Sequence, residues 1–138
     1  MIVADTNVIA ATVLRTSEQT ANARGLLESD RDWAAPQLWR SEFCNILATS
    51  VRNRWLDAEQ AVVALAAAQD LMQGNDFSVP AGEVLQLAIA SGCTAYDCEF
   101  VVLARDLGVQ LVTLDRAVLK AFPDIAVSLD SLCPGSAV

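Results

Sequence analysis

The sequence contains no histidine, only one lysine and no C-x-x-C pair of cysteines. Without histidine the chain has few tools for hydrolysis other than its carboxylates. A zinc site is disfavoured for the same reason, although a site made of four cysteines stays open. Three of the cysteines fall in or beside apolar helical stretches, so we expect reduced, buried thiols in a cytosolic protein. The four are Cys44, Cys93, Cys98 and Cys133.

The sequence also lacks a long apolar run, because none approaches the roughly 18 residues of a membrane span. Its first residues carry no basic segment, and Asp5 interrupts them before the apolar part of a secretory signal could form. No repeat, linker or low-complexity block is present. At 138 residues we expect one domain over residues 1–138, with a short tail at 130–138 that includes Pro134-Gly135. We expect a cytoplasmic protein with no membrane partner.

Basic residues are scarce, with nine Lys and Arg against 17 Asp and Glu and a net charge of −8. This balance argues against a broad basic face for nucleic acid and predicts attraction to a basic protein partner. Eight of the nine bases are arginine, which favours a few placed phosphate contacts, with Arg15, Arg40 and Arg116 as candidates. Hydrophobic residues make up 54%, which leaves apolar area for a dimer or a bound partner.

Short apolar strands alternate with helical patterns along the chain. Continuous apolar strands separated by helices are typical of a parallel sheet covered on both faces. The sequence therefore predicts an α/β fold, a single Rossmann-like domain with a parallel sheet of about five short strands. We expect strands at 2–5, 33–35, 77–79, 109–113 and 125–127, and helices at 7–14, 17–29, 37–54, 57–74, 82–91, 94–108 and 116–122, with Ser17 capping the second helix.

Four acidic residues occupy positions where such a domain would gather them into one pocket. Asp5 and Asp115 each end a strand, and sites in parallel sheets form beyond the carboxyl ends of the strands. Glu42 lies in an apolar helical pattern, and Asp97 lies near the start of a helix. Clustered carboxylates without histidine suit Mg²⁺ or Mn²⁺, which support phosphodiester chemistry. Two carboxylates about 5 Å apart repel by on the order of 3 kcal/mol, so this hypothesis requires the cation.

Each acid also has an ordinary structural interpretation. Asp5 and Asp115 could cap the helices that follow them, and Asp97 could be the third helical residue of a capping box. Glu42 is the least easily dismissed, because a carboxylate beside a buried stripe is costly unless it is paired.

The position of several other residues in these patterns predicts a supporting, surface or core role for each. We take the hydroxyl of Thr113 and the amide oxygen of Asn7 as supporting polar groups at the same edge of the sheet. The remaining acids, Glu99 among them, read as solvated surface. Large aromatic residues read as core or interface anchors, namely Trp33, Trp39, Trp55 and Phe100.

Four segments carry a resemblance to a known family. They are Ile2-Val3-Ala4-Asp5-Thr6-Asn7-Val8-Ile9, the helix from Pro36 to Leu47 with Ser41-Glu42, Thr94-Ala95-Tyr96-Asp97 running into Leu103-Ala104, and Leu111-Val112-Thr113-Leu114-Asp115-Arg116. In this order and at these spacings they resemble the PIN-domain ribonucleases, particularly the VapC-like toxins of prokaryotic toxin–antitoxin pairs. The combination spans nearly the whole chain and is specific, although no single segment is.

The resemblance implies a sheet of strand order 3-2-1-4-5 with the four acids around Mg²⁺ or Mn²⁺. It implies that Asp5, Glu42, Asp97 and Asp115 are both catalytic and metal-binding, with Asn7 and Thr113 in support. The family cleaves single-stranded or looped RNA through a metal-activated water, leaving 5′-phosphate and 3′-hydroxyl ends. Its toxins commonly form homodimers and are silenced by an antitoxin whose tail covers the site. The expected partners are therefore RNA, a second copy of the chain and a basic antitoxin.

Two rival interpretations stay open. A haloacid-dehalogenase-like phosphatase also places an Asp after the first strand, but its nucleophile is usually followed two residues later by a second Asp, where this chain has Asn7. Lys120 is the sole candidate for the charge-balancing amine of that family. A non-catalytic PIN-fold module would instead use the acidic surface only to bind a basic protein. Metal-dependent cleavage separates these possibilities.

Overall fold

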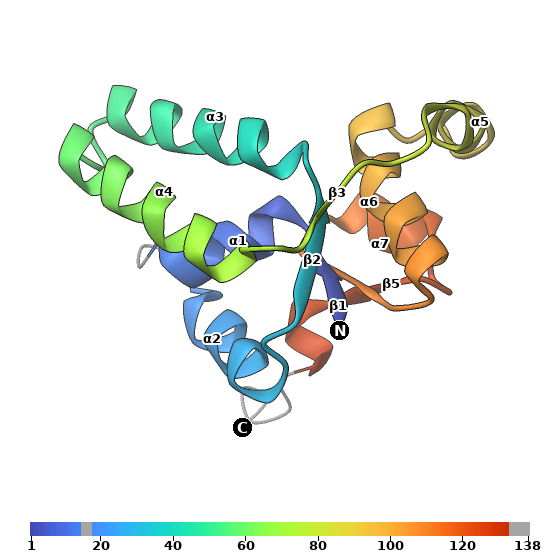
Figure 1. The fold of residues 1–138 in the computed structure, drawn as a ribbon, viewed down its shortest axis with the longest axis horizontal. Coiled ribbons are helices and arrows are strands. Elements are labelled where there is room, and N and C mark those ends of the chain that lie inside the picture. The colour runs from blue at the N-terminus through green and yellow to red at the C-terminus, as the bar shows by residue number, and fades with distance from the viewer. Residues whose placement is uncertain (15–17, 133–138) are drawn as a thin grey trace.

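The computed structural model describes residues 1–14 and 18–132 and has a five-stranded sheet at its centre (Figure 1). All neighbouring strands pair in parallel, in the order β3-β2-β1-β4-β5. The α/β fold and the strand order expected from the sequence are thus confirmed. The strands are β1 (Ile2–Ala4), β2 (Trp33–Pro36), β3 (Asp76–Phe77), β4 (Leu111–Thr113) and β5 (Ala126–Ser128).

Helices cover both faces of the sheet. Figure 1 shows α1, α3 and α4 on one side of the strands and α5, α6 and α7 on the other. The bounds are α1 (Thr6–Val13), α2 (Thr20–Ser29), α3 (Trp39–Arg52), α4 (Ala58–Met72), α5 (Ala81–Ser91), α6 (Ala95–Leu107) and α7 (Arg116–Ala121), followed by the 3₁₀ helix η1 (Leu129–Leu132). No single helix in the described part of the chain is long and apolar enough to cross a membrane; α5 and α6 meet that criterion only together, across a bend of 114°.

The core lies between the central strands and the helices on either side. Strands β1, β2 and β4 are buried along their whole length, as continuous apolar strands in a parallel sheet should be. Trp33, Trp39 and Phe100 are core residues, as expected. Trp55 is not a core residue, because 67% of its surface is exposed in the loop before α4.

Helix α3 and strand β4 each begin two residues later than the sequence pattern predicts, and hydrogen bonds explain both differences. The N–H of Gln37 donates to the carbonyl of Phe77 at 3.0 Å, which extends the β2–β3 pairing, so α3 starts only at Trp39. The N–H of Val109 donates to the carbonyl of Ala104 at 3.0 Å, which closes the end of α6, so β4 does not start at Val109.

A few expectations fall on positions outside the described ranges. These are Ser17 as a helix cap, Cys133 as a buried thiol, and the tail beyond residue 132, including Pro134-Gly135. Among the cysteines that are described, Cys98 is buried as expected, Cys93 is partly buried, and Cys44 is exposed, contrary to expectation.

Candidate active site

Asp5 lies at the carboxyl end of β1 and is held by two hydrogen bonds. Its Oδ1 accepts the backbone N–H of Thr6 at 2.8 Å, and its Oδ2 accepts the hydroxyl of Thr113 at 2.7 Å. Asp5 is 8% exposed and caps α1, so its role as a helix cap and its place among the other acids are compatible. Burial raises the pKa of Asp5 to about 6. The charges of Glu42 and Asp97 also raise this pKa, whereas the two hydrogen bonds lower it.

Glu42 lies in the first turn of α3, opposite the start of α1. Its Oε1 accepts the hydroxyl of Thr6 at 2.7 Å. Partial burial raises the pKa of Glu42; the hydrogen bond from Thr6 opposes the shift, and the charges of Asp97 and Glu99 add to it. A charged partner that would offset the cost of its position is not observed: within the described residues Glu42 makes no ion pair.

Asp97 and Asp115 both lie at helix N-termini. Asp97 is in the first turn of α6, and its backbone N–H donates to the hydroxyl of Thr94 at 3.1 Å. Asp115 caps α7, with Oδ1 accepting the N–H groups of Ala117 at 2.8 Å and Val118 at 3.1 Å. Burial raises the pKa of Asp97, and the charge of Asp115 raises it further. Asp115 is thus the helix cap that its position in the sequence predicted, and the N–H of Asp97 makes one of the two bonds of the expected capping box.

The four acids form one electrostatic group. The charges of Glu42 and Asp97 raise the pKa of Asp5, the charge of Asp97 raises the pKa of Glu42, and the charge of Asp115 raises the pKa of Asp97. In the described part of the chain none of the four is paired with a basic side chain. The fold therefore brings like charges together and supplies no cation to offset them.

The two supporting residues contact the site in different ways. Thr113 donates its hydroxyl to Asp5 and accepts the N–H of Asp115 at 3.0 Å, so it bridges two of the acids. Asn7 accepts the N–H of Leu114 at 3.3 Å through Oδ1, which ties α1 to the loop after β4. Asn7 thus supports the backbone near the site.

The three arginines proposed as phosphate contacts differ in their surroundings. Arg40 forms an ion pair with Asp76 at the start of β3, so its guanidinium already has a carboxylate partner. Arg116 is exposed, directly follows Asp115 and makes no ion pair within the described residues. Arg15 lies outside the described ranges. Arg116 remains the candidate with a free guanidinium next to the acids.

Two residues belong to this site that sequence reasoning missed. Thr6 donates to two of the acids, and the only sequence sign of this was a hydroxyl directly after Asp5. Glu99, expected on the solvated surface, is half-buried; burial raises its pKa, and its charge raises the pKa of Glu42. An acid in the otherwise apolar run Cys98–Ala104 was the available sign for Glu99.

The donor set suits a hard dication, although the side chains are not arranged as a finished metal site. All the available donors are carboxylate and hydroxyl oxygens, which Mg²⁺ and Mn²⁺ prefer. Across the described ranges, no three acidic or cysteine side chains lie close enough together to form a metal site as they stand. Binding of an ion would therefore require the side chains to rotate toward it, with the attraction between the cation and the carboxylates offsetting the repulsion among the four acids.

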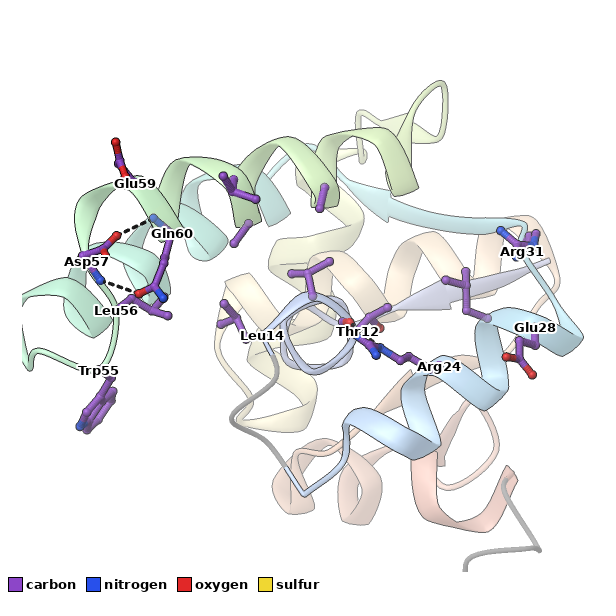
Figure 2. Close-up of a pocket in the computed structure, with 15 residues that line it drawn as sticks. Thr12, Leu14, Arg24, Glu28, Arg31, Trp55, Leu56, Asp57, Glu59 and Gln60 are labelled. Carbon is purple, nitrogen blue, oxygen red and sulfur yellow. Dashed lines mark hydrogen bonds between the residues drawn. The ribbon is translucent and has the colours of Figure 1, made fainter.

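A groove in the described part of the protein lies away from these acids (Figure 2). It has a volume of about 970 Å³ and runs between α1, α2 and α4, beside the loop that carries Trp55. Leu14, Leu27 and Val63 are among its apolar lining residues, and Arg24 and Glu28 are among its charged ones. None of the four acids lines it, so the groove is a separate surface.

Comparison with known proteins agrees with this arrangement. The PIN domain family matches residues 2–125. One similar solved structure is PAE2754 from Pyrobaculum aerophilum, with 23% identity over 99% of this chain and 96% of that chain and a TM-score of 0.78. FitAcB from Neisseria gonorrhoeae has 18% identity, covers 94% of this chain and 98% of that chain, and has a TM-score of 0.68. A toxin–antitoxin complex from Klebsiella pneumoniae has 16% identity, the same two coverages and a TM-score of 0.67. At these identities they share the fold. No curated protein is similar enough to be matched.

Proposed function

The chain belongs to the PIN-domain family, and from that premise we propose that it is a Mg²⁺- or Mn²⁺-dependent endoribonuclease and the toxin of a toxin–antitoxin pair. PIN domains are generally nucleases, which supports hydrolysis of phosphodiester bonds. The observation that carries the proposal is the coupling among Asp5, Glu42, Asp97 and Asp115, whose charges converge without a basic partner in the described residues.

In this proposal the four acids hold the ion at the carboxyl edge of the sheet. A bound Mg²⁺ or Mn²⁺ supplies an activated water and offsets the charge on the phosphodiester. Thr113 keeps the Asp5 carboxylate oriented, and the N–H groups at the start of α7 keep Asp115 oriented. Arg116 is placed to contact a phosphate that approaches Asp115. The half-buried position of Asp97 and Glu42 leaves part of each carboxylate open to substrate.

We also propose that the chain acts with protein partners, namely a second copy of itself and a basic antitoxin in the cytoplasm. The net charge of −8 favours a basic partner. The exposed large apolar side chains include Trp55 and Val63 beside the groove, and Leu85 and Ile89 on α5. Surfaces of this kind are suited to protein contacts. One similar solved structure, from Klebsiella pneumoniae, is a toxin–antitoxin complex.

The non-catalytic module remains the second candidate, because the acidic surface that attracts a basic protein exists with or without turnover. The phosphatase alternative loses its support. The chain belongs to the PIN-domain family instead. Asn7, which stands where the second Asp of a phosphatase would be, accepts a hydrogen bond from the N–H of Leu114.

Incubation of the purified chain with total RNA and Mn²⁺, followed by mapping of the ends, tests the proposal. We expect cleavage that a chelator stops, with 5′-phosphate and 3′-hydroxyl products. Glu42→Gln is the matched control, because it keeps the size of the side chain and removes its charge. Cleavage that continues in the chelator, or equally in Glu42→Gln, would refute the metal-dependent mechanism. Absence of cleavage in the wild type would favour the binding module.

A further inference from the structure

We propose that Thr6 is a positioning residue that fixes the carboxylates of Asp5 and Glu42 relative to each other and thereby sets the affinity of the site for its metal ion. This inference rests on the proposed function, since it assumes that these two acids take part in metal binding.

Thr6 is the residue that connects the two acids directly. Its backbone N–H donates to Oδ1 of Asp5 at 2.8 Å, and its hydroxyl donates to Oε1 of Glu42 at 2.7 Å. Glu42 lies 36 positions away in the sequence, on a different helix, so the second bond fixes α1 and α3 to each other at the site. Thr6 is 4% exposed, so the donor end of both bonds is shielded from water.

The hydroxyl of Thr6 supplies the hydrogen-bond donor that fixes the side chain of Glu42. An ionised Glu is only an acceptor, and its long side chain can adopt several rotamers unless a donor selects one. A hydroxyl-to-carboxylate bond of this length is of the strong, charge-assisted kind. The bond from Thr6 therefore selects one orientation of a side chain that is only half-buried and otherwise free to turn.

The bond belongs to a longer chain of hydrogen bonds through the site. From Asp115 the chain runs through its N–H to the hydroxyl of Thr113 at 3.0 Å, and from there to Oδ2 of Asp5 at 2.7 Å. Thr6 continues it from Oδ1 of Asp5 to Glu42. Two threonines thus hold opposite oxygens of Asp5, and the chain connects β4, β1 and α3. Without Thr6 the chain stops at Asp5, and Glu42 loses its link to it.

A purely helical role does not account for the Thr6 hydroxyl. Thr12, which lies on the same helix and is also buried, donates its hydroxyl to the carbonyl of Val8 four residues earlier, at 2.9 Å. This is the common local bond of a helical threonine. Thr6 is the first residue of α1 and has no preceding turn of helix to bond to. Its hydroxyl is directed instead to Glu42.

Mn²⁺ binding by three full-length variants, measured by isothermal titration calorimetry without RNA, tests the proposal. Thr6→Val removes the hydroxyl at similar size, and we expect its affinity for Mn²⁺ to fall about tenfold to a hundredfold, the usual cost of removing a group that orients a metal ligand. Thr6→Ser restores the donor and should stay near the wild type. Thr12→Val is the matched control and should bind as the wild type does.

Cleavage of RNA provides a second measurement. The Mn²⁺ concentration for half-maximal activity should rise in Thr6→Val by a factor similar to the loss of affinity, with most of the maximal rate recovered at saturating Mn²⁺. A structural defect would lower the rate at every concentration. If Thr6→Val does not fold, as judged by thermal unfolding in chelator, Thr6→Ala against Thr6→Ser gives the same comparison.

Two results would overturn the inference while leaving the proposed function intact. One is wild-type affinity for Mn²⁺ in Thr6→Val, and the other is an equal loss of affinity in Thr12→Val. A wild-type chain that neither binds Mn²⁺ nor cleaves RNA would instead refute the proposed function, and this inference with it.

Discussion

At the scale of single residues, Asp5 shows how the fold concentrates unfavourable charge where chemistry can use it. It is the most buried of the four acids, and its two hydrogen-bond donors only partly offset the cost of its burial. A carboxylate held in this way binds protons more readily in the folded chain than in the unfolded one. Without a metal ion, the site therefore weakens the fold at neutral pH.

This argument gives a prediction for metal-free stability. The pKa of Asp5 rises from 3.8 to about 6, so the folded state binds more protons over that interval and its stability falls as pH rises through it. The difference amounts to about 3 kcal/mol from low to neutral pH. Urea unfolding in chelator at several pH values should show this decline, and Asp5→Asn should flatten it. A wild-type stability that rises over the same interval would contradict the prediction.

Asp97 gives a second prediction at this scale. Asp97→Asn removes one charge from the repelling group, so the metal-free variant should unfold at a temperature higher by on the order of 2 °C. The same substitution removes a proposed metal ligand, so Mn²⁺-dependent RNA cleavage should fall by at least about a hundredfold. Thermal unfolding in chelator and the cleavage assay measure the two effects. Unchanged cleavage would remove Asp97 from the mechanism.

Some site residues could be predicted from sequence and others could not. Asp5 and Asp115 follow apolar strands, and Glu42 interrupts an apolar helical face, so each is visible in its local pattern. Thr6 acquires its role only from the packing of α1 against α3, and Glu99 only from the effect of its charge on Glu42, which lies on another helix. No local sequence pattern predicts a contact between two residues that are 36 positions apart and lie on different helices, as Thr6 and Glu42 do.

At the scale of elements, four helix N-termini point their acids into one site. Asp5 caps α1 and Asp115 caps α7, while Glu42 and Asp97 lie in the first turns of α3 and α6. The N-terminus of a helix carries partial positive charge, which stabilises a nearby carboxylate. The helix N-termini therefore offset part of the repulsion among the four acids.

The boundaries of elements were harder to predict than their existence. The apolar pattern predicts a helix from Gln37 and a strand from Val109, but at both positions the backbone N–H is used by a neighbouring element. Hydrophobic periodicity reports which face of a segment is buried, whereas the ends depend on where each N–H finds an acceptor.

The two glycines of α5 give a matched pair of predictions. Gly92 ends the helix with φ of 76°, so Gly92→Ala forces a strained backbone and should destabilise the protein by about 1 kcal/mol. Gly82 lies within the helix and has open space around its Cβ position, so Gly82→Ala should stabilise by about 0.5 kcal/mol. Urea unfolding measures both, and Mn²⁺ affinity should not change. Equal effects of the same sign would contradict the backbone argument.

At the scale of the whole molecule, the net charge of −8 and the four acids, unpaired among the described residues, favour a dication as the stabilising ligand under the proposed function. A ligand that binds only the folded state adds about 2.7 kcal/mol at one hundred times its Kd. For a chain of 138 residues this corresponds to a rise in melting temperature of roughly 8 °C. Differential scanning calorimetry with Mn²⁺ or with chelator measures it, and Asp97→Asn should show a much smaller rise. A wild-type melting temperature that does not respond to Mn²⁺ would count against the metal site.

The strand order also governs when activity can arise during synthesis. Strand β1 leaves the ribosome first, yet it lies between β2 and β4, and Thr113, which bonds Asp5, follows 108 residues later. A nascent chain therefore carries the first acid of its site long before it can assemble the site. Under the proposed function, the nuclease therefore stays inert until translation is nearly complete.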